Sequence, residues 1–451
     1  MPILIKNGRI IDPARGLDEA RDIYIEGERI SEVPKNGGSG KGVEVIDAAG
    51  KLVVPGLIDM HCHLREPGFE YKENIASGTR AAAAGGFTTV CCMPNTSPVN
   101  DNRSVTEFIL KQAESAGYCR VIPVGAVTKG SAGAELAEIG DMAGAGCRAF
   151  SDDGKPVINA EMMRRALEYA KTFGVTIISH CEDTALSAGG VMNEGPVSTR
   201  LGLRGIPAAA EEVMVARDIA LARLTGGRLH IAHVSTEGSV RLVRQAKAEG
   251  LNVTAETCPH YLFFDHQDFE RIGPAAKCAP PIRSRQDVEA LWECVLGGLV
   301  DTIGSDHSPC TWDEKVKGME NIWKAWGGIS GVQLTLPVLL SEGVNKRDLA
   351  LPALARMLSY NPARLFGLYP QKGAIQVGAD ADLVVVDLDK EWTLTAEQLF
   401  YKNKFSAYVG STFKGQVQRT LVRGKTVYQD GQIVAQPGYG KLLRRSYPYA
   451  Y

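Results

Sequence analysis

The stretch IDMHCHLREPG, residues 58–68, places two histidines and an arginine at alternate positions. In an extended strand alternate side chains share a face, so His61, His63 and Arg65 would point the same way. Two imidazoles that converge on one point suit a borderline metal such as zinc. The competing interpretation is a pair of hydrogen-bonding histidines at a strand end. The spacing favours a metal site.

Further potential metal ligands stand at the ends of other short apolar runs of the chain. If these runs are parallel strands of a barrel, their C-terminal ends meet on one face, and so do the side chains that follow them. Several such residues at strand ends strengthen the metal hypothesis. They are Asp152 and Asp153 after the fourth run, His180 after the fifth, His233 after the sixth and Asp306 at the end of the eighth.

The remaining histidines have less to recommend them as ligands. His230 shares a run with His233 but lies three positions away, which predicts the opposite face. His260 and His266 follow a strand end and are expected in loops, so all three are interpreted as structural. His307 is expected to hydrogen bond beside the metal site, not to bind the metal itself.

Short apolar, β-branched runs alternate with helix-like stretches over most of the chain. Near-continuous apolar runs between helices are typical of a parallel sheet buried on both faces. Eight such units predict an α/β fold, a (β/α)₈ TIM barrel. An open doubly wound sheet is disfavoured, because no glycine-rich phosphate motif follows the first run. The runs are residues 57–63, 87–93, 121–127, 147–153, 175–181, 228–234, 252–258 and 300–306.

Both ends of the chain differ from its middle in the pattern of polar and apolar residues. ILIKNGRIIDPARG, DIYIEGERISEV and VEVIDAAGKLVV alternate polar and apolar residues between turn signals, as in hairpins, and the same texture returns after residue 372. Lone hairpins are marginal in water, so the two ends are expected to pair into one small β-sandwich. The predicted division is 1–54 and 372–451 for the sandwich and 55–371 for the barrel. The tail YGKLLRRSYPYAY either packs on a neighbouring subunit or is loose.

Composition excludes several classes of protein. Apolar residues make up 44% and charged residues 23%, as in a well-cored globular protein. A net charge of −2 gives no electrostatic case for nucleic acid or an anionic membrane. No apolar run reaches the ~18 residues of a membrane span, and the N-terminus lacks the layout of a signal peptide. Ten cysteines are scattered without a framework spacing. Several lie inside apolar runs and are interpreted as small buried hydrophobes in a reducing cytoplasm: Cys91, Cys92, Cys119 and Cys181.

Long motifs make the chain resemble a cyclic amidohydrolase of the amidohydrolase superfamily over essentially its whole length. The N-terminal half resembles type I dihydroorotases through HCHLREPG, EYKENIASGTRAAAAGGFTTVCCMPNT and FSDDG. The later half is similar to allantoinases and hydantoinases through ETCPHY, KCAPPIR, GSDHSPC and WKAWGGISG. The resemblance implies a hydrolase that opens a small cyclic amide and works as a homodimer or homotetramer.

The resemblance also implies two zinc ions per chain and a bridging group between them. In allantoinases and hydantoinases a carboxylated lysine on the fourth strand is the bridge, but the fourth run of this chain has no lysine. The second aspartate of the dihydroorotase motif DDG replaces it, which is Asp153 here. The alternative is a turn of solvated acids at 152–154. The other matching ligands are His61, His63 and Asp306 for the more buried zinc and His180 and His233 for the second.

A mechanism follows from this arrangement. Two zinc ions would lower the pKa of a bridging water toward neutrality, and the hydroxide would attack the ring amide. Asp306 would take the proton and return it to the leaving nitrogen. Arg65 offers a planar fork for a substrate carboxylate, which the matching arginine and Asn95 hold in the resembled dihydroorotases. The competing interpretations are an ion pair of Arg65 with Glu66 or Glu70 and a turn role for Asn95.

Two positions depart from dihydroorotases and look like allantoinases. Ala279 stands where they carry an asparagine, and Cys310 where they carry a histidine, and both replaced side chains face substrate in the resembled family. We predict a dihydroorotase that interconverts dihydroorotate and N-carbamoyl-aspartate in pyrimidine biosynthesis, with allantoinase or hydantoinase as the alternative. A catalytically silent assembly partner is a remote third hypothesis, disfavoured because every ligand position is filled.

Overall fold

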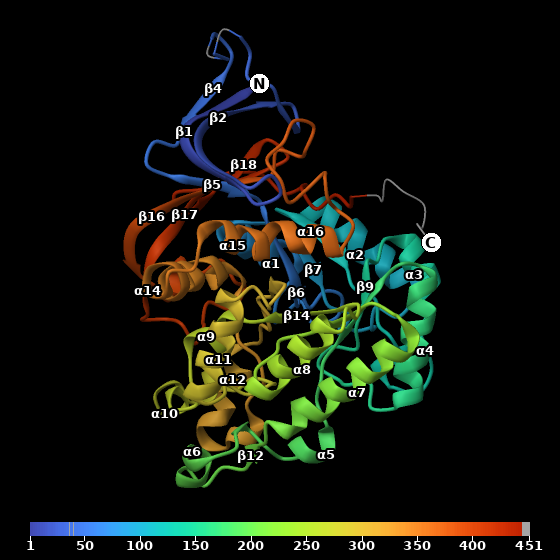
Figure 1. Cartoon of the computed structure of the whole chain (residues 1–451). Helices are drawn as coiled ribbons and strands as arrows, with labels where there is room; N and C mark the ends of the chain where they lie inside the picture. Colours follow the sequence, from blue (N-terminus) through green and yellow to red (C-terminus); the bar gives the residue numbers. More distant parts are fainter. Residues whose placement is uncertain (36, 39, 444–451) are drawn as a thin grey trace.

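Eight parallel strands form a closed barrel at the centre of the molecule (Figure 1). The computed structural model describes residues 1–35, 37–38 and 40–443. Neighbouring strands pair in chain order, and single bridges from Gly125 to Phe150 and from Cys62 to His307 close the ring. The predicted fold class is confirmed. The barrel strands are β6 (Leu57–Cys62), β7 (Phe87–Cys92), β8 (Arg120–Pro123), β9 (Ala149–Phe150), β10 (Thr176–Ser179), β13 (Leu229–Ile231), β14 (Val253–Thr257) and β15 (Thr302–Ile303).

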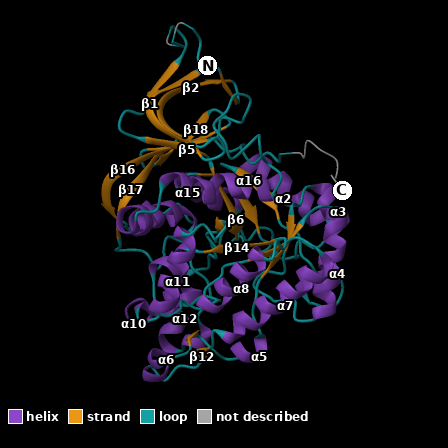
Figure 2. Ribbon diagram, in the orientation of Figure 1, coloured by secondary structure: helices purple, strands orange, loops and turns teal. Residues whose placement is uncertain are grey.

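Amphipathic helices surround the barrel (Figure 2). Their starts follow from capping side chains: Asn74 accepts a hydrogen bond from the Ser77 backbone N–H, and Asn102 accepts one from the Val105 N–H. The outer helices are α1 (Ile75–Ala84), α2 (Arg103–Ala116), α3 (Ile139–Ala145), α4 (Ala160–Thr172), α7 (Ala209–Thr225), α8 (Glu237–Ala248) and α11 (Arg285–Leu296). After β15 follow η4 (Val332–Leu334), α13 (Thr335–Val338), η5 (Leu339–Val344), α14 (Asn345–Arg347), α15 (Leu351–Ala355), η6 (Arg356–Tyr360) and α16 (Asn361–Leu365).

Short elements crowd the end of the barrel where its strands finish. Figure 1 shows several of them at the end of the molecule far from the β-sandwich. They belong to the segments that follow strands, where a barrel carries its active site. They are η1 (Lys129–Ser131), α5 (Thr184–Ser187), β11 (Met192–Asn193), α6 (Pro196–Arg200), β12 (Gly205–Ile206), α9 (Pro259–Phe263), α10 (Asp268–Ile272), η2 (Gly273–Ala276), α12 (Trp312–Glu320) and η3 (Ile322–Lys324).

The two ends of the chain share one sheet, as the sequence predicted. β5 pairs antiparallel with β16, which joins the N-terminal strands to the C-terminal ones. Buried isoleucines and valines of both ends form a separate core on this sheet. The division at residues 54 and 371 remains a prediction. The strands are β1 (Ile3–Asp12), β2 (Leu17–Glu26), β3 (Arg29–Ser31), β4 (Glu44–Asp47), β5 (Leu52–Pro55), β16 (Leu383–Thr393), β17 (Thr412–Val422), β18 (Lys425–Gln429) and β19 (Gln432–Ile433), with η7 (Ala396–Gln398) between β16 and β17.

One expected hairpin is wrong. β1 and β2 form a hairpin, but β4 and β5 do not pair with each other. Both run parallel to β1, with β4 beside residues 3–6 and β5 beside residues 9 and 10. The turn at 48–51 therefore shifts the chain along β1 without reversing it. Alternation of polar and apolar residues identified the strands, but it carries no information about strand direction.

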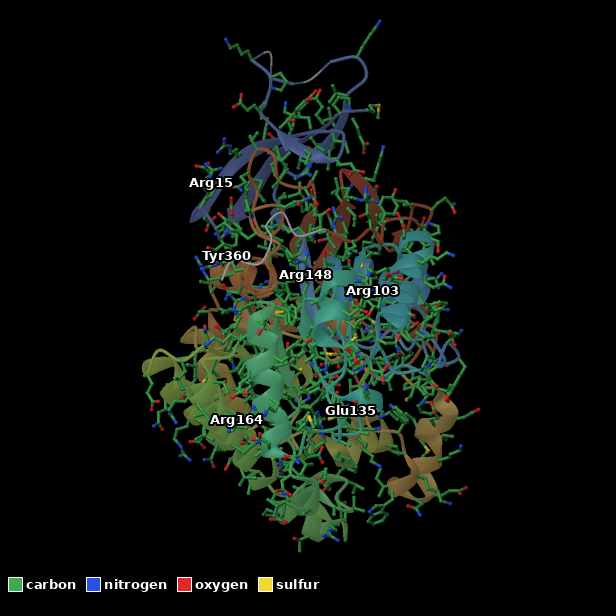
Figure 3. All side chains as sticks on the ribbon, turned by 90° about the vertical axis from the view of Figure 1, so that its right-hand side faces the viewer. Arg15, Arg103, Glu135, Arg148, Arg164 and Tyr360 are labelled. Atoms are coloured by element: carbon green, nitrogen blue, oxygen red, sulfur yellow. The ribbon has the colours of Figure 1, made fainter. Side chains whose placement is uncertain are left out.

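The interior of the barrel is closed at the end nearest the sandwich. Apolar side chains of the strands fill it, and Phe366 and Leu368 pack below them. Leu443 joins the same cluster, and the Arg148 guanidinium donates to its carbonyl oxygen at 2.7 Å. In the side view of Figure 3, Arg148 lies closer to the sandwich than Arg164 does. The tail of the sequence analysis falls mainly on residues 444–451, which lie outside the described residues.

Two findings bear on cellular context. Within the described residues, the helices do not combine the length and apolar content that crossing a membrane requires. All ten cysteines are free and buried, so they act as small apolar side chains as expected.

Candidate active site

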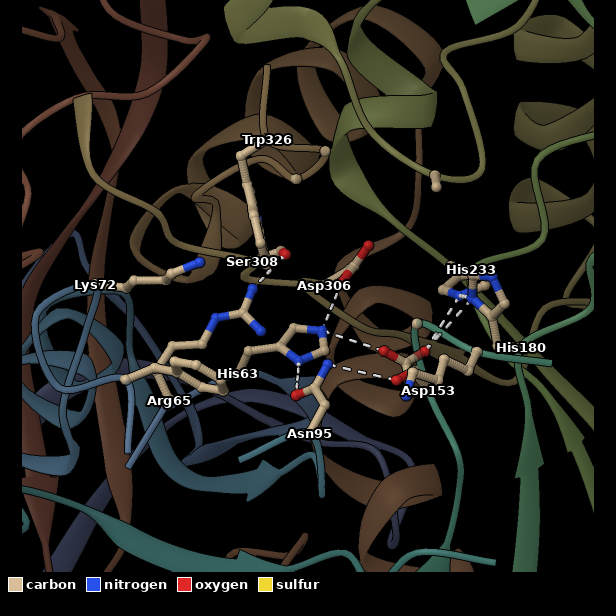
Figure 4. A pocket seen from close by; sticks show the side chains of 16 residues that line it. His63, Arg65, Lys72, Asn95, Asp153, His180, His233, Asp306, Ser308 and Trp326 are labelled. Carbon is tan, nitrogen blue, oxygen red and sulfur yellow. Dashed lines mark hydrogen bonds and ion pairs between the residues drawn. The ribbon is translucent and has the colours of Figure 1, made fainter. Parts of the chain in front are cut away.

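A cavity of about 300 Å³ opens at the C-terminal ends of the barrel strands (Figure 4). It brings together most of the residues singled out from the sequence, although they come from loops after seven different strands. Figure 4 shows the cationic side chains on one side and the histidines His180 and His233 on the other. The lining comprises His63, Arg65, Phe69, Lys72, Asn95, Asp153, Gly154, Lys155, His180, His233, Ala279, Asp306, Ser308, Trp326, Gly327 and Gly328.

Asp153 lies at the centre of the predicted ligands. Its Oδ1 is 3.3 Å from His61 Nε2, 3.4 Å from His233 Nε2 and 3.7 Å from His180 Nδ1. Its Oδ2 is 3.3 Å from His63 Nε2. One carboxylate therefore faces four imidazoles with two different oxygens, which is the geometry that a bridging ligand needs. The alternative of a solvated acid does not fit, because Asp153 is only 4% exposed.

Asp306 approaches the same cluster from the opposite side. Its Oδ1 lies 3.2 Å from His63 Nε2 and 3.5 Å from His61 Nε2. Its backbone has φ of 40°, and that of His233 has φ of 35°, in the left-handed region that side chains with a Cβ rarely adopt. Such strain clusters at functional sites, where the surrounding fold must stabilise it.

Two carboxylates that the sequence analysis did not identify orient the histidines. His61 Nδ1 donates to Glu256 Oε1 at 2.6 Å, and His180 Nε2 donates to Glu182 Oε2 at 2.9 Å. Each bond leaves the opposite ring nitrogen directed at the centre, which is how carboxylates orient metal-binding histidines. The signal for Glu256 was present in the sequence as an acidic side chain within an apolar barrel strand. A Cβ at Gly304 would lie 2.6 Å from Glu256 Oε2, so the next strand leaves room for it only as glycine.

The aspartates and histidines of the cluster shift one another's pKa values. Burial alone would raise the pKa of Asp153, but His61, His180 and His233 hold it well below its usual range. Burial would lower the pKa of His180, yet Asp153 and Glu182 raise it to about 10. The pKa of Asp306 is also lowered by neighbouring histidines, against the effect of its burial. The buried carboxylates are thus anionic and require positive charge beside them.

The residues present fit a metal ion. His61, His63 and Asp306 place one ligand atom each within 4.8 Å of one another, and so do His61, Asp153 and His233. His61 Nε2 and Asp153 Oδ1 are buried without a hydrogen-bond partner in the described part of the chain. Imidazole nitrogens with carboxylate oxygens are a donor set typical of zinc. An unsatisfied buried polar atom is costly, and a bound cation would satisfy both atoms.

Arg65 is a buried cation that lines the cavity. It is 4% exposed, and its guanidinium donates to Ser308 Oγ at 2.8 Å and to the Pro309 carbonyl at 3.2 Å. Among the described residues, no carboxylate lies within ion-pairing distance of it. The competing ion pairs are absent there, since the carboxylates of Glu66 and Glu70 accept backbone N–H groups instead.

The other three predicted substrate contacts differ in placement. Asn95 lines the cavity, but its Oδ1 accepts a hydrogen bond from His63 Nδ1 at 2.9 Å, so the amide orients a histidine. Ala279 lines the cavity, and its small side chain leaves space there. Cys310 is buried and is not among the lining residues. The conformation of the loops determines which of these side chains reach the cavity. The sequence motifs give no information about that conformation.

Asp152, His230 and His307 lie outside the central cluster. His260, interpreted as structural and expected in a loop, lies instead in α9, with a ring nitrogen within 4.8 Å of an oxygen of Asp306. Asp152 accepts hydrogen bonds from the backbone N–H groups of Val127 and Thr128, which separates its role from that of Asp153. His230, expected on the opposite face, lies 3.4 Å from the second oxygen of Glu256. His307 has its Nε2 3.5 Å from Glu73 Oε2 and is directed away from the ligands.

The chain is similar to known amidohydrolases in sequence and in structure. The family model described as Dihydro-orotase-like matches residues 50–239, and that of the Amidohydrolase family matches residues 322–428. A dihydroorotase of Geobacter metallireducens is 48% identical over 95% of this chain and 100% of its own length. One of Geobacter sulfurreducens is 50% identical over 96% of this chain and 100% of its own length. A solved L-hydantoinase (dihydropyrimidinase) from Arthrobacter aurescens superposes with a TM-score of 0.88 at 30% identity, covering 97% of this chain and 98% of that chain.

Barrel, sandwich and buried ligand cluster together define a cyclic amidohydrolase, an enzyme that acts on carbon–nitrogen bonds of cyclic amides. The two dihydroorotases match nearly the whole chain at 48–50% identity, so they identify its family as well as its fold. The chain belongs to the dihydroorotase-like family of the amidohydrolase superfamily.

Proposed function

We propose that the protein is a dinuclear zinc dihydroorotase of pyrimidine biosynthesis, which interconverts dihydroorotate and N-carbamoyl-aspartate. The observation that carries the proposal is Arg65, a buried guanidinium that lines the cavity and has no carboxylate of the described residues within ion-pairing distance. A buried charge without a counter-ion is costly, so a site that keeps one is built for an anionic ligand. Dihydroorotate brings the carboxylate that allantoin and hydantoin lack. The relatives that bear the name dihydroorotase over their whole length support the same choice.

We assign the metal ligands by proximity to the cluster. His61, His63 and Asp306 would hold one ion, His180 and His233 the other, and Asp153 would lie between the two. Zinc bound in such a site lowers the pKa of water toward neutrality and polarises a carbonyl. Because Asp153 would supply the bridging carboxylate, no carboxylated lysine would be required.

The side chains of this chain have separate tasks in the proposed reaction. Asp306 is anionic and lies at the edge of the cavity, so it accepts the proton of the attacking water and returns it to the leaving ring nitrogen. Arg65 holds the substrate carboxylate and fixes the orientation of the ring. Glu256 and Glu182 keep the histidine rings from rotating.

A hydantoinase or allantoinase is the second candidate. Ala279 lines the cavity without offering a polar contact, and the superposed solved structures include hydantoinases at 28–30% identity. A neutral ring would, however, leave Arg65 without a partner in the bound state, which costs binding free energy.

A side-by-side assay tests the proposal. Purified protein is given dihydroorotate, allantoin and hydantoin under identical conditions, and its metal content is measured in parallel. Turnover of dihydroorotate with two zinc ions per chain supports the proposal. Robust turnover of allantoin or hydantoin with none of dihydroorotate would transfer the protein to the second candidate, and absence of metal would favour the silent assembly partner.

We also propose a homodimer or homotetramer in the cytoplasm. The free state of all ten buried cysteines supports a reducing compartment. Light scattering on the purified protein measures the assembly directly.

A further inference from the structure

One wall of the cavity joins an indole to two cations. Lys72 Nζ lies 3.2 Å from the ring centroid of Trp326, and the Arg65 Cζ lies 5.5 Å from it. Both cations are buried, whereas the indole is 36% exposed and lines the cavity. In Figure 4 the two cationic side chains extend from the same side, below Trp326. A cation over an indole face is attracted by the negative face of the ring. We name these three residues the indole wall.

The two cations of the indole wall differ in how their charge is balanced. Lys72 Nζ pairs with Glu314 Oε1 at 2.8 Å, so a protein carboxylate neutralises it. Arg65 donates only to the neutral oxygens of Ser308 and Pro309. Among the described residues, the wall therefore carries one positive charge that no direct ion pair neutralises. That charge matches a ring with a single carboxylate, and a ring without charge leaves it unmatched.

The segment that carries Trp326 is fastened in place. The Trp326 backbone N–H donates to the Glu314 carbonyl at 3.0 Å, and Lys277 Nζ donates to the carbonyls of Ile322, Trp323 and Ala325 at 2.8–3.2 Å. Gly328 has φ of +148°, and a Cβ there would lie 2.4 Å from Ser308 Oγ, the group that holds Arg65. The indole is thus positioned before any ligand arrives, which lowers the entropic cost of binding.

We propose that Trp326 is a specificity-determining residue, whose indole receives the ring of cyclic amides that carry one carboxylate and directs that carboxylate onto Arg65. The inference rests on the proposed function for the reaction, and it adds the residue that distinguishes a charged ring from a neutral one. Lys72 is a positioning residue, since its ammonium lies over the indole ring and forms an ion pair with Glu314. Trp326 comes from a motif that resembles allantoinases and hydantoinases, whereas Arg65 and Lys72 come from motifs that resemble dihydroorotases.

Binding of two probe molecules to the full-length protein tests the proposal without requiring turnover. Orotate is a planar six-membered ring with one carboxylate, and uracil is the same ring without it. Isothermal titration calorimetry measures both affinities. Trp326→Leu is expected to weaken orotate binding by about tenfold. Uracil binding should weaken by a smaller factor, because uracil has the same ring but no carboxylate for the indole to direct onto Arg65. Trp326→Phe should retain most of the affinity, because it keeps an aromatic face.

Matched variants separate selectivity from general damage. Trp312→Leu removes an indole of similar exposure that packs on Phe405 outside the cavity lining, and it should change neither affinity. Lys72→Met should weaken orotate binding less than Trp326→Leu does. Lys72→Arg, which keeps a cation over the indole, should bind orotate as the wild type does. Orotate affinity within about twofold of wild type in Trp326→Leu, or an equal loss for uracil, would overturn the proposal.

The outcomes for the wild-type protein distinguish this inference from the proposed function. Wild-type protein that prefers orotate over uracil but does not hydrolyse dihydroorotate refutes the proposed reaction and leaves the indole wall intact. Wild-type protein that hydrolyses dihydroorotate but binds uracil as tightly as orotate refutes the indole wall. If Trp326→Leu fails to fold, as shown by circular dichroism, Trp326→Phe and the two Lys72 variants decide the question.

Discussion

Replacement of Arg65 by methionine should affect catalysis and stability in opposite directions. Methionine keeps the length of the aliphatic stem and removes the guanidinium. Truncation of one partner in a buried charge pair costs about 2–5 kcal/mol. A value of about 3 kcal/mol corresponds to a loss of about 10²-fold in kcat/KM for dihydroorotate, at about 1.36 kcal/mol for each factor of ten.

The folded protein without substrate should not suffer from the same change. Burial lowers the pKa of Arg65, against the opposite effect of Asp306 and Asp153, so burial disfavours the charged form. The hydrogen bonds of Arg65 in the described part of the chain go to two neutral oxygens, at 2.8 and 3.2 Å. Replacement of buried charges by apolar side chains of similar volume is often neutral or stabilising by about 1–4 kcal/mol. The free energy of unfolding of Arg65→Met should therefore be unchanged or higher by about 1 kcal/mol.

Steady-state kinetics on dihydroorotate, denaturant unfolding and metal analysis are the three measurements. Arg120→Met is the matched control, since Arg120 is as buried as Arg65 but pairs with Asp380, so its loss should destabilise by about 3–5 kcal/mol. Both metals should stay bound in Arg65→Met. Undiminished kcat/KM, or a loss of stability as large as that of the control, would refute the reasoning.

Four further predictions concern the cluster and its surroundings. Asp306→Asn should keep most of the metal and lower kcat by about 10² or more in a steady-state assay, because the proton carrier is lost; near-wild-type turnover would contradict it. Elemental analysis of Asp153→Ala should show the loss of a metal ion. Activity of the wild type should not depend on bicarbonate. A lysine carbamate detected by carbon-13 labelling would disprove the assignment of Asp153 as the bridging ligand. Glu256→Gln should weaken metal affinity about 10–100-fold in a chelator competition, with unaltered affinity as the contrary result. Burial lowers the pKa of His260 from 6.5 to about 4, so the unfolded chain binds more protons than the folded one between these two values. The free energy of unfolding should therefore fall by about 3 kcal/mol as the pH decreases through that window. His260→Gln should flatten this decrease, and an unchanged pH profile of its denaturant midpoints would rule out His260 as the source.

The barrel could be predicted because each of its strands leaves a local signal. Residues 147–153 and 300–306 were identified as strands from their apolar runs, although only Ala149–Phe150 and Thr302–Ile303 have regular pairing there. The histidines at strand ends were placed by topology alone, since every barrel strand ends on the same face. The direction of β4 and β5 was not accessible, because it depends on which neighbour each strand pairs with.

The finer parts of the site depend on contacts between distant segments. Lys72 and Trp326 meet through loops that follow the first and the last barrel strands, and nothing in either stretch indicates the other. Asn95 matched a motif for substrate binding, but the proximity of His63 occupies its amide oxygen. A motif gives the residue type at a position. It does not give the partner that the fold places beside it.

Pairing between β5 and β16 has a consequence for synthesis of the protein. β5 leaves the ribosome early and β16 late, so the edge of the N-terminal sheet has no strand beside it while the whole barrel is being made. Unpaired edges invite association with other chains, and such non-local pairing is slow to form. Leu443, which packs in the core at the closed end of the barrel, is synthesised after both β5 and β16. Nascent chains are therefore most prone to aggregate before the final segment is released, and a premature stop codon near the end should yield protein that fails to mature.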